Sequence, residues 1–411
     1  LQGISTEAWS RHGRVSLAGA TAKGVFRTVK FRGTTGLQGP YELLSAARNT
    51  GEVIIAGTER VYIDGAEMTR GQNHDYVIDY DQGTITFTPR VLITRDTEIA
   101  VDFEASQERY DRSVVLSGAQ TAALPGAFQL DVLYAREGDN KDRPRNITID
   151  DAERSVLRDA GDDPDAAVTG GVVQTEPGKG EYILIPADSA GPDRYAFDDS
   201  TGEYNVSFLE VGVGMGDYTL GGISNAGRPY YEYVGAGQGN YVVGKGLPLP
   251  ESLEVITARA RRSGKHVDVD LEWNVSEHDR NLFSPLDDDD NSGDAGRLRL
   301  ALKRLPAVGF EFGVAGNVST IEDRFTSFDK ARPSYFYRDW NLENDALVGR
   351  EVLSEVEGTV ARAGSQLVYS FGRLDRDDVD GTKHEGRFEA GTLADRGAQV
   401  RAFDTRTDQS R

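Results

Sequence analysis

Residues 267–275 read Val267-Asp268-Val269-Asp270-Leu271-Glu272-Trp273-Asn274-Val275. Apolar and polar side chains alternate at every position, which is the period of a β-strand with one apolar and one polar face. Similar alternation follows in Arg297–Leu302 and in Val352–Val360. Runs of about ten residues are longer than the usual strands of globular sheets. The pattern therefore predicts long antiparallel strands.

The connections between these strands alternate in length. Long polar stretches, such as Glu277–Ala295 and Thr320–Gly349, separate the hairpins. A water-soluble sandwich has no reason to sort its loops in this way, whereas a bacterial outer-membrane barrel has short periplasmic turns and long external loops. The short turns fall at Leu124-Pro125-Gly126, Arg262-Ser263-Gly264-Lys265, Pro306-Ala307-Val308-Gly309, Arg362-Ala363-Gly364-Ser365 and Asp395-Arg396-Gly397.

The beginning of the chain predicts a separate β-sandwich-like domain that is soluble in water. Arg60–Gly65 is a strand that ends on Asp-Gly, and Asp75–Tyr80 and Thr84–Thr88 flank a short turn with Gly83. We therefore expect an all-β chain whose N-terminal domain precedes the antiparallel hairpins of a whole or partial outer-membrane-type β-barrel. The boundaries are 1–110 for the soluble domain, 111–137 for the first barrel hairpin, 138–252 for a long inserted region and 253–411 for the remaining hairpins.

The inserted region combines a helix with a repeat. Asp150–Gly161 has an Asp cap, an early Glu and a terminal Gly, so it predicts a short helix. Gly178–Tyr182, Gly214–Tyr218 and Gly237–Tyr241 share the pattern Gly-x-Gly-[Asp/Glu/Asn]-Tyr. A repeated turn of this kind predicts a β-module in which Gly shapes the turn and Tyr begins the next strand.

Composition excludes several classes of protein. The chain has 411 residues and a formal net charge of -21, which argues against a nucleic-acid partner. It contains no cysteine, so it has neither disulfides nor thiol chemistry. No apolar run approaches the length of a transmembrane helix. The start, Leu1-Gln2-Gly3-Ile4, does not read as a leader sequence, so either a leader was removed or, as we expect, the chain is an excerpt of a longer protein.

No motif in the sequence indicates a catalytic residue or an organic cofactor. The five histidines lie far apart, and no P-loop, Gly-x-Ser-x-Gly elbow or His-Glu-x-x-His motif is present. The run from Asp287 to Asp294 is the one candidate for a metal, with Asp288, Asp290 and Asp294 as Ca²⁺ ligands. Arg299 stands where an EF-hand would have its bidentate Glu, so this would be a site of another geometry, and a solvated external loop is the alternative.

The aromatic stretch Ser334-Tyr335-Phe336-Tyr337-Arg338-Asp339-Trp340 lies in a long loop. It allows three interpretations: a platform for a ligand, part of an interfacial aromatic girdle, or a loop that folds back to plug or line the barrel mouth. The sequence does not choose among them.

Two sets of segments resemble known proteins. Lys23–Arg27, Leu37–Tyr41 and Gly57–Tyr80 resemble large bacterial envelope proteins. Asp279–Asp288, together with the Gly-x-Gly-Asp-Tyr repeats, is similar to parts of the cell-surface translocon of the type IX secretion system. That resemblance implies a very large outer-membrane β-barrel through which folded cargo leaves a Gram-negative cell, and it supplies no catalytic residues.

We therefore expect a non-enzymatic protein of the bacterial outer membrane or cell surface, acting as a pore, translocon or surface-assembly component. Its partners would be outer-membrane lipid and other envelope or secretion proteins, and not nucleic acid. Acidic side chains would line the lumen, namely Asp268, Asp270, Glu272, Glu355 and Glu357. The alternatives are a soluble, secreted or surface-tethered β-repeat protein for adhesion or structure, and a glycan-processing enzyme with paired carboxylates.

Overall fold

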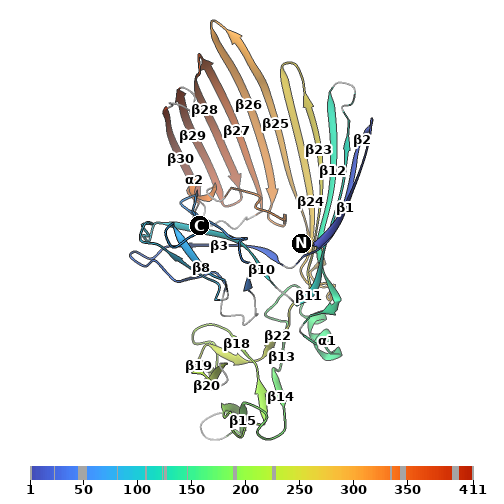
Figure 1. Ribbon diagram of the computed structural model, residues 1–411, viewed down its shortest axis with the longest axis vertical. Helices are drawn as coiled ribbons and strands as arrows, with labels where there is room; N and C mark the ends of the chain where they lie inside the picture. Colours follow the sequence, from blue (N-terminus) through green and yellow to red (C-terminus); the bar gives the residue numbers. More distant parts are fainter. Residues whose placement is uncertain are drawn as a thin grey trace.

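The computed structural model shows an all-β protein whose described residues include two short α-helices (Figure 1). The structure describes residues 2–22, 24–44, 53–80, 82–106, 109–122, 124, 127–145, 147–187, 192–224, 228–333, 336–342, 349–390 and 398–409. No helix within these ranges is long and apolar enough to cross a bilayer.

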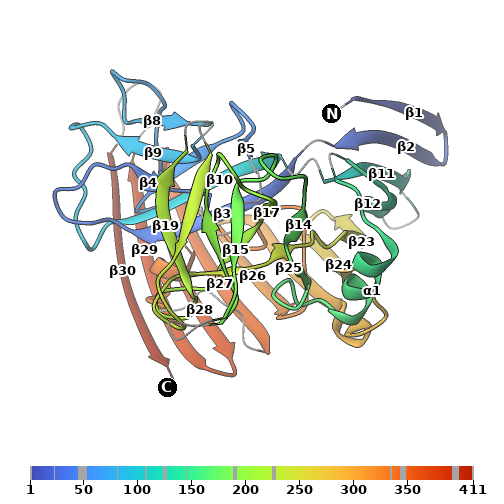
Figure 2. The ribbon, with the colours of Figure 1, turned by 90° about the horizontal axis from the view of Figure 1, so that it is seen from below.

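One large sheet dominates the molecule. Its 12 strands are antiparallel throughout and form an open arc with β1 and β30 at its two ends (Figure 2). Within the described residues neither outermost strand pairs beyond its one neighbour, so the sheet is not closed. In spatial order the strands are β1 (Gln2–Ser10), β2 (Gly13–Ala22), β11 (Tyr110–Thr121), β12 (Phe128–Pro144), β23 (Ser252–Ser263), β24 (Val267–Asp279), β25 (Ser292–Ala307), β26 (Phe310–Glu322), β27 (Arg350–Arg362), β28 (Ser365–Arg376), β29 (Val379–Ala390) and β30 (Ala398–Gln409).

The short turns lie at one edge of this sheet, as the sequence predicts. The turns between β25 and β26 and between β27 and β28 hold two residues each with positive φ, Val308 and Gly309 in one and Ala363 and Gly364 in the other. Positive φ at both central residues is the type I′ geometry that matches the twist of paired strands. The predicted turn at residues 395–397 lies outside the described residues, as do Pro125 and Gly126 of the first.

Most connections at the opposite edge are long, with one exception. Only Asp377 and Asp378 separate β28 from β29. The expectation that long loops separate all successive hairpins is therefore wrong at this hairpin. The acidic pair was hidden in a polar stretch that gave no separate turn signal.

A β-sandwich domain is inserted between β2 and β11. It consists of a sheet of β3 (Val25–Arg32), β10 (Glu98–Ser106), β6 (Arg60–Ile63), β7 (Ala66–Glu67) and β5 (Val53–Ile54), and a second sheet of β4 (Tyr41–Glu42), β9 (Thr84–Phe87) and β8 (Tyr76–Asp79). Buried side chains from both sheets, including Val61, Ile85, Ile99 and Phe103, form its core. Below, residues 25–106 are called the sandwich domain.

The predicted boundary at residue 110 requires a correction. Residues 2–22 form β1 and β2, which pair with each other and with β11 in the large sheet. The first hairpin of the large sheet thus precedes the sandwich domain instead of following it. Alternation is weak in this segment because Ala18 and Ala20 occupy one face of β2, and small side chains carry little polarity contrast.

The second insertion, residues 145–251, begins with the expected helix. α1 (Asp151–Asp159) is capped by Asp150, and Asp150 and Glu153 form a reciprocal capping box. Its end is fastened to the connection between β24 and β25, because the buried Asn281 side chain donates hydrogen bonds to the carbonyls of Leu157 (2.7 Å) and Gly161 (2.6 Å). The predicted helix is confirmed.

The rest of this insertion is a small module, residues 168–246, made of two equivalent halves. Its two four-stranded sheets have the same strand order, so the second half repeats the first. The first contains β14 (Val172–Gln174), β17 (Tyr204–Val206), β15 (Tyr182–Ile185) and β16 (Arg194–Phe197), and the second β18 (Phe208–Glu210), β21 (Tyr241–Val243), β19 (Tyr218–Ile223) and β20 (Pro229–Tyr233). β13 (Val168–Thr169) and β22 (Lys245–Gly246) pair at its base.

The Gly-x-Gly-[Asp/Glu/Asn]-Tyr repeats supply the tyrosines that connect the two halves of the module. Tyr182 and Tyr218 are buried, and their hydroxyl oxygens accept hydrogen bonds from the backbone of Tyr231 (3.0 Å) and Tyr195 (2.9 Å) in the opposite half. The glycines precede these tyrosines because the backbones approach too closely for a side chain. A Cβ on Gly239 would overlap the carbonyl oxygen of Tyr218.

We predict that Gly239→Ala destabilises the module, whereas Gly170→Ala does not. The added Cβ at Gly239 must displace backbone, which costs about 1–3 kcal/mol for an overpacked site. A Cβ at Gly170, in the same module, meets nothing within 4 Å. Denaturant unfolding followed by near-ultraviolet circular dichroism measures the difference, and equal midpoints for the two variants would contradict the close-approach explanation.

The module is also expected to lose stability in alkali. Burial raises the pKa of Tyr182 to about 12 from its ordinary value of 10.0. The folded state therefore favours the neutral phenol, so the stabilisation is complete below pH 10.0 and is lost as the pH rises towards about 12. Burial also raises the pKa of other tyrosines, Tyr76 and Tyr110 among them, so a titration of tyrosinate absorbance should show a late step whose amplitude Tyr182→Phe reduces by one tyrosine. A single transition near the ordinary pKa in the parent protein would exclude this effect.

Candidate functional site

The two faces of the large sheet differ in chemistry. Residues that are direct partners in adjacent antiparallel strands point to the same side, so the register assigns each side chain to a face. One row runs Asp131, Arg259, Glu272, Arg297 and Ser319 across β12, β23, β24, β25 and β26. We call this side, which faces the interior of the arc, the polar face.

The opposite side is an apolar belt, and its side chains are exposed. Leu300 and Val356 keep 47% and 53% of their surface exposed, although both are central in their strands. The belt contains Leu130, Val132, Ile256, Leu271, Trp273, Val275, Leu298, Leu300, Leu302, Phe312, Val314, Val318, Val356, Leu367, Tyr369, Phe371 and Phe388. It is interrupted at β30, whose matching positions include Asp404 and Arg406.

The five acids predicted to line a lumen all lie on the polar face, but they do not make it acidic. Asp270 pairs with Arg259 (2.8 Å), Glu272 lies 3.5 Å from Arg297, and Asp268 lies 3.3 Å from Lys303. The acidic lumen expected from these residues therefore needs correction, because basic side chains from β23 and β25 alternate with them across the strands. Two of these basic residues, Arg297 and Arg299, belong to the alternating stretch that the sequence already shows.

Glu355 and Glu357 occupy the same face on β27. The Glu355 carboxylate accepts a hydrogen bond from Asn317 (3.2 Å). Glu357 lines the same cavity as Glu355. Because these acids come from a different strand than Asp268, only the register of the whole sheet shows that they share a surface.

The loop between β26 and β27 folds back onto the polar face. We call its described residues 325–333 and 336–340 the cover segment. Arg332 donates two hydrogen bonds to one oxygen of Glu351 (2.9 and 2.7 Å) and one to the Ser319 hydroxyl (3.0 Å). Glu351 is 0% exposed and also lies 3.8 Å from the Arg376 guanidinium. A buried carboxylate with two guanidinium partners holds the cover segment to the sheet.

Trp340 anchors the other end of the cover segment, which includes the short helix α2 (Phe336–Asp339). The indole is 3% exposed and lies over Gly372 and Gly381, where an added Cβ would come within 3.1 and 3.3 Å of the ring. Glycine at both positions makes room for the ring. Of the three interpretations of the aromatic stretch, the geometry agrees with a loop folded back over the sheet. Ser334 and Tyr335 lie outside the described residues.

Hydrogen bonds extend this anchor to the last strand. The hydroxyls of Thr405 and Thr407 on β30 donate to the carbonyl oxygens of Asp339 (3.0 Å) and Trp340 (2.8 Å). Lys383 lies 3.3 Å from the Asp339 carboxylate. α2 is thereby connected to both β29 and β30.

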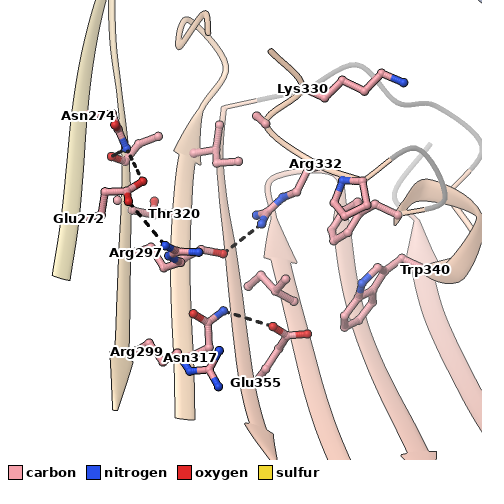
Figure 3. Close-up of a pocket in the computed structure, with 18 of the residues that line it drawn as sticks. Glu272, Asn274, Arg297, Arg299, Asn317, Thr320, Lys330, Arg332, Trp340 and Glu355 are labelled. Carbon is pink, nitrogen blue, oxygen red and sulfur yellow. Dashed lines mark hydrogen bonds and ion pairs between the residues drawn. The ribbon is translucent and has the colours of Figure 1, made fainter. Parts of the chain in front are cut away.

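A cavity of about 830 Å³ lies between the cover segment and the polar face (Figure 3). Arg297, Arg299, Asn317 and Glu355 contribute from the sheet, and Lys330 and Arg332 from the cover segment. Both charge signs are present, so the arrangement suits a hydrated compartment with hydrogen-bonding walls. The aromatic part of the cover segment was singled out in the sequence, whereas residues 325–333 were not, because their partners on the sheet and on the sandwich domain are far from them in sequence.

The sandwich domain contacts the cover segment from the other side. The Lys330 ammonium lies 2.6 Å from the Asp102 carboxylate on β10, and 5.4 Å from the centre of the Tyr62 ring. Lys30 on β3 lies over the Tyr337 ring at 4.3 Å, and Arg338 donates a hydrogen bond to the Asp64 carbonyl. The cover segment is therefore held between two parts of the protein.

A second charged cluster lies where the second insertion leaves the sheet. Arg112 pairs with Asp139 (2.9 Å) and Glu251 (2.7 Å), and His278 lies 3.3 Å from Glu251. Burial raises the pKa of Glu251, but the hydrogen bond with His278 and the charge of Arg112 outweigh it and lower that pKa to about 2. The carboxylate thus stays charged and fastens the strand ends around the insertion.

The candidate calcium ligands are not brought together. Asp294 points to the outer side of β25 and binds the Arg350 guanidinium (2.8 Å), whereas Asp288 and Asp290 lie in the exposed 3-10 helix η2 (Asp288–Asp290). Across the described ranges, no three His, Asp or Glu residues form a group that could hold a metal ion. The prediction of Ca²⁺ therefore gains no support from the geometry.

Comparison with known proteins adds one match. A family model described as a domain of unknown function (DUF8818) matches residues 26–107, which coincide with the sandwich domain. No curated protein matches the chain, and no solved structure does. The resemblance to the secretion translocon stays a prediction.

We predict that Glu351→Gln destabilises the cover segment by about 3–5 kcal/mol, because it removes the charge of the buried carboxylate that binds the Arg332 guanidinium. Arg376 keeps its ion pair with Asp378. Denaturant unfolding followed by fluorescence of the buried Trp340 measures this effect. Glu355→Gln, on the same strand and face, is the matched control and should shift the midpoint much less. Equal shifts would show that Glu351 has no special role.

Proposed function

We propose that the large sheet forms part of the wall of a β-barrel in the bacterial outer membrane, where the protein acts as a non-enzymatic pore, translocon or surface-assembly component. The observation that carries this proposal is the apolar belt, which is exposed on one side of a sheet whose other side is charged. Polar-in, apolar-out alternation over long antiparallel strands is the pattern of transmembrane barrels.

The extent of the belt supports lipid as its partner. Monomeric soluble proteins rarely expose apolar patches larger than a few hundred Å². Full burial of one Val, Leu or Phe side chain is worth about 1.5–3 kcal/mol, so leaving the whole belt in water would be very unfavourable. On the same side of β24, apolar residues alternate from Val267 to Val275, a stretch of nine residues, and a tilted transmembrane strand needs about 9–11 residues.

Charged side chains mark one border of the belt. On its outer side, near the edge with the long loops, lie the ion pairs Arg136–Glu254 (3.2 Å), Asp294–Arg350 (2.8 Å) and Arg373–Asp380 (3.0 Å). Such exposed pairs suit a water-facing or headgroup-facing level and are poorly placed in hydrocarbon. Both insertions leave from this same edge (Figure 1), so in the proposed orientation they lie on the cell surface.

The outer edges of β1 and β30, unpaired within the described residues, bear on whether the sheet is the whole barrel wall or a part of it. In hydrocarbon every backbone N–H and C=O group must be paired, and open sheet edges are not viable. In the proposed membrane state β1 and β30 therefore pair with further strands. This is why we propose part of a barrel wall, and the resemblance to a very large translocon barrel supports it.

Detergent dependence tests the proposal. The protein should need detergent to remain monodisperse, and the unheated folded form should migrate differently on a denaturing gel from the heated form. Stable, monodisperse behaviour in plain buffer would overturn the membrane proposal and would favour a secreted or surface-tethered β-repeat protein.

We predict that Leu300→Arg impairs insertion into lipid vesicles, whereas Ala301→Arg does not. Leu300 lies at the centre of the belt, where an Arg facing lipid costs about 2–4 kcal/mol. Ala301, the next residue of β25, points to the polar face, so the same charge remains in water. The heat-dependent gel shift after refolding with vesicles measures insertion. If both variants inserted equally, the belt would not face lipid.

A further inference from the structure

We propose that the sandwich domain is a clamp that keeps the cover segment closed over the polar face, with the Asp102–Lys330 ion pair as its central contact. Loss of this contact opens the cavity beneath the cover segment. Under this proposal, the sandwich domain controls access to the cavity between the cover segment and the polar face. A role of this control in transport rests on the proposed function, but the contact between Asp102 and Lys330 does not.

The cover segment is pinned to the sheet at separate points. The backbone N–H of Thr326 donates to the buried Ser276 hydroxyl (3.0 Å), Arg332 binds Glu351, and Trp340 lies over its two glycines. Residues 327–331 lie between the first two points and form a roof over the cavity. A roof fixed at its ends can open in the middle without unfolding the sheet.

Lys330 lies in the middle of this roof, and its side chain reaches the sandwich domain. The Lys330 and Asp102 side chains are 17% and 10% exposed, so water screens this 2.6 Å ion pair only weakly. The Tyr62 ring beside Lys330 adds a second attraction for the same ammonium group. The roof thus has a charge-assisted contact on the side away from the sheet.

Asp102 is positioned for this contact by its own domain. It lies in β10, the strand that pairs with β3, β5 and β6, and its carboxylate accepts a hydrogen bond from the Thr28 hydroxyl (2.8 Å). A carboxylate in the middle of a buried strand is costly unless it has partners. Val101 and Phe103, the neighbours of Asp102 in β10, belong to the hydrophobic core of the sandwich domain. The ion pair with Lys330 explains why a charged residue lies between them.

The sandwich domain and the cover segment share further contacts besides the Asp102–Lys330 ion pair. Lys30 over Tyr337 and Arg338 at the Asp64 carbonyl join the sandwich domain to the α2 end of the cover segment. The domain therefore covers both the roof and the Trp340 anchor. A ligand or partner that displaced the domain would release both together.

The chain has no cysteine, so one introduced thiol reports on the cavity. Asn317→Cys places the thiol in the cavity lining, and its rate of reaction with a bulky maleimide measures opening. Lys330→Gln and Asp102→Asn should each raise this rate about tenfold, the effect of removing one charge-assisted hydrogen bond. The double variant should react no faster than either single variant, because the two residues act through one contact.

Two controls separate opening from general unfolding. A thiol at Ser16, on the polar face but outside the cavity lining, should react at the same rate in all these variants. Lys303→Glu breaks the ion pair with Asp268, which does not involve the cover segment, and should leave the Asn317→Cys rate unchanged. An unchanged rate in both Lys330→Gln and Asp102→Asn, or rates that multiply in the double variant, would overturn the clamp.

The measurement is made in whichever medium keeps the protein monodisperse. If the membrane proposal is wrong, the protein will be monodisperse without detergent. The labelling rates would still test the clamp in that case. Failure of the clamp would appear only in the labelling rates.

Discussion

The in-register pairing of the twelve strands is the constraint on which the rest of the structure depends. Side chains alternate strictly along a strand, so a slip of one residue between two strands would exchange their faces. Rows such as Asp131, Arg259, Glu272 and Arg297 exist only because each neighbouring pair keeps its register. The same register assembles the apolar belt on the opposite side.

The polar face gains its properties from combining strands. Acids on β24 meet arginines on β23 and β25, so charges that would repel within one strand are balanced across strands. The same surface provides Glu351 and Gly372 as attachment points for the cover segment. The compartment beneath it is therefore a joint product of the sheet, one long loop and, through Asp102, the sandwich domain.

Turns, the helix cap and the starts of some strands could be predicted from the sequence, because each depends on residues close together in the chain. Asp-Gly at residues 64 and 65 closes a hairpin, Asp150 and Glu153 cap α1, and the Gly-x-Tyr repeats begin strands. The prediction failed for residues 2–22, where small side chains weaken the alternation. It also failed for the charge of the polar face, which depends on partners in neighbouring strands.

The sequence by itself determined an all-β chain of long hairpins, since alternation and turn residues specify strand, face and turn without distant partners. It also determined the repeats of the module, since close backbone approach requires glycine. Only the tertiary structure decided that the arc stays open in the described residues, that Asp294 binds Arg350, and that Lys330 meets Asp102. These contacts join residues far apart in the chain, and no local pattern encodes which of many carboxylates a given Lys or Arg will reach.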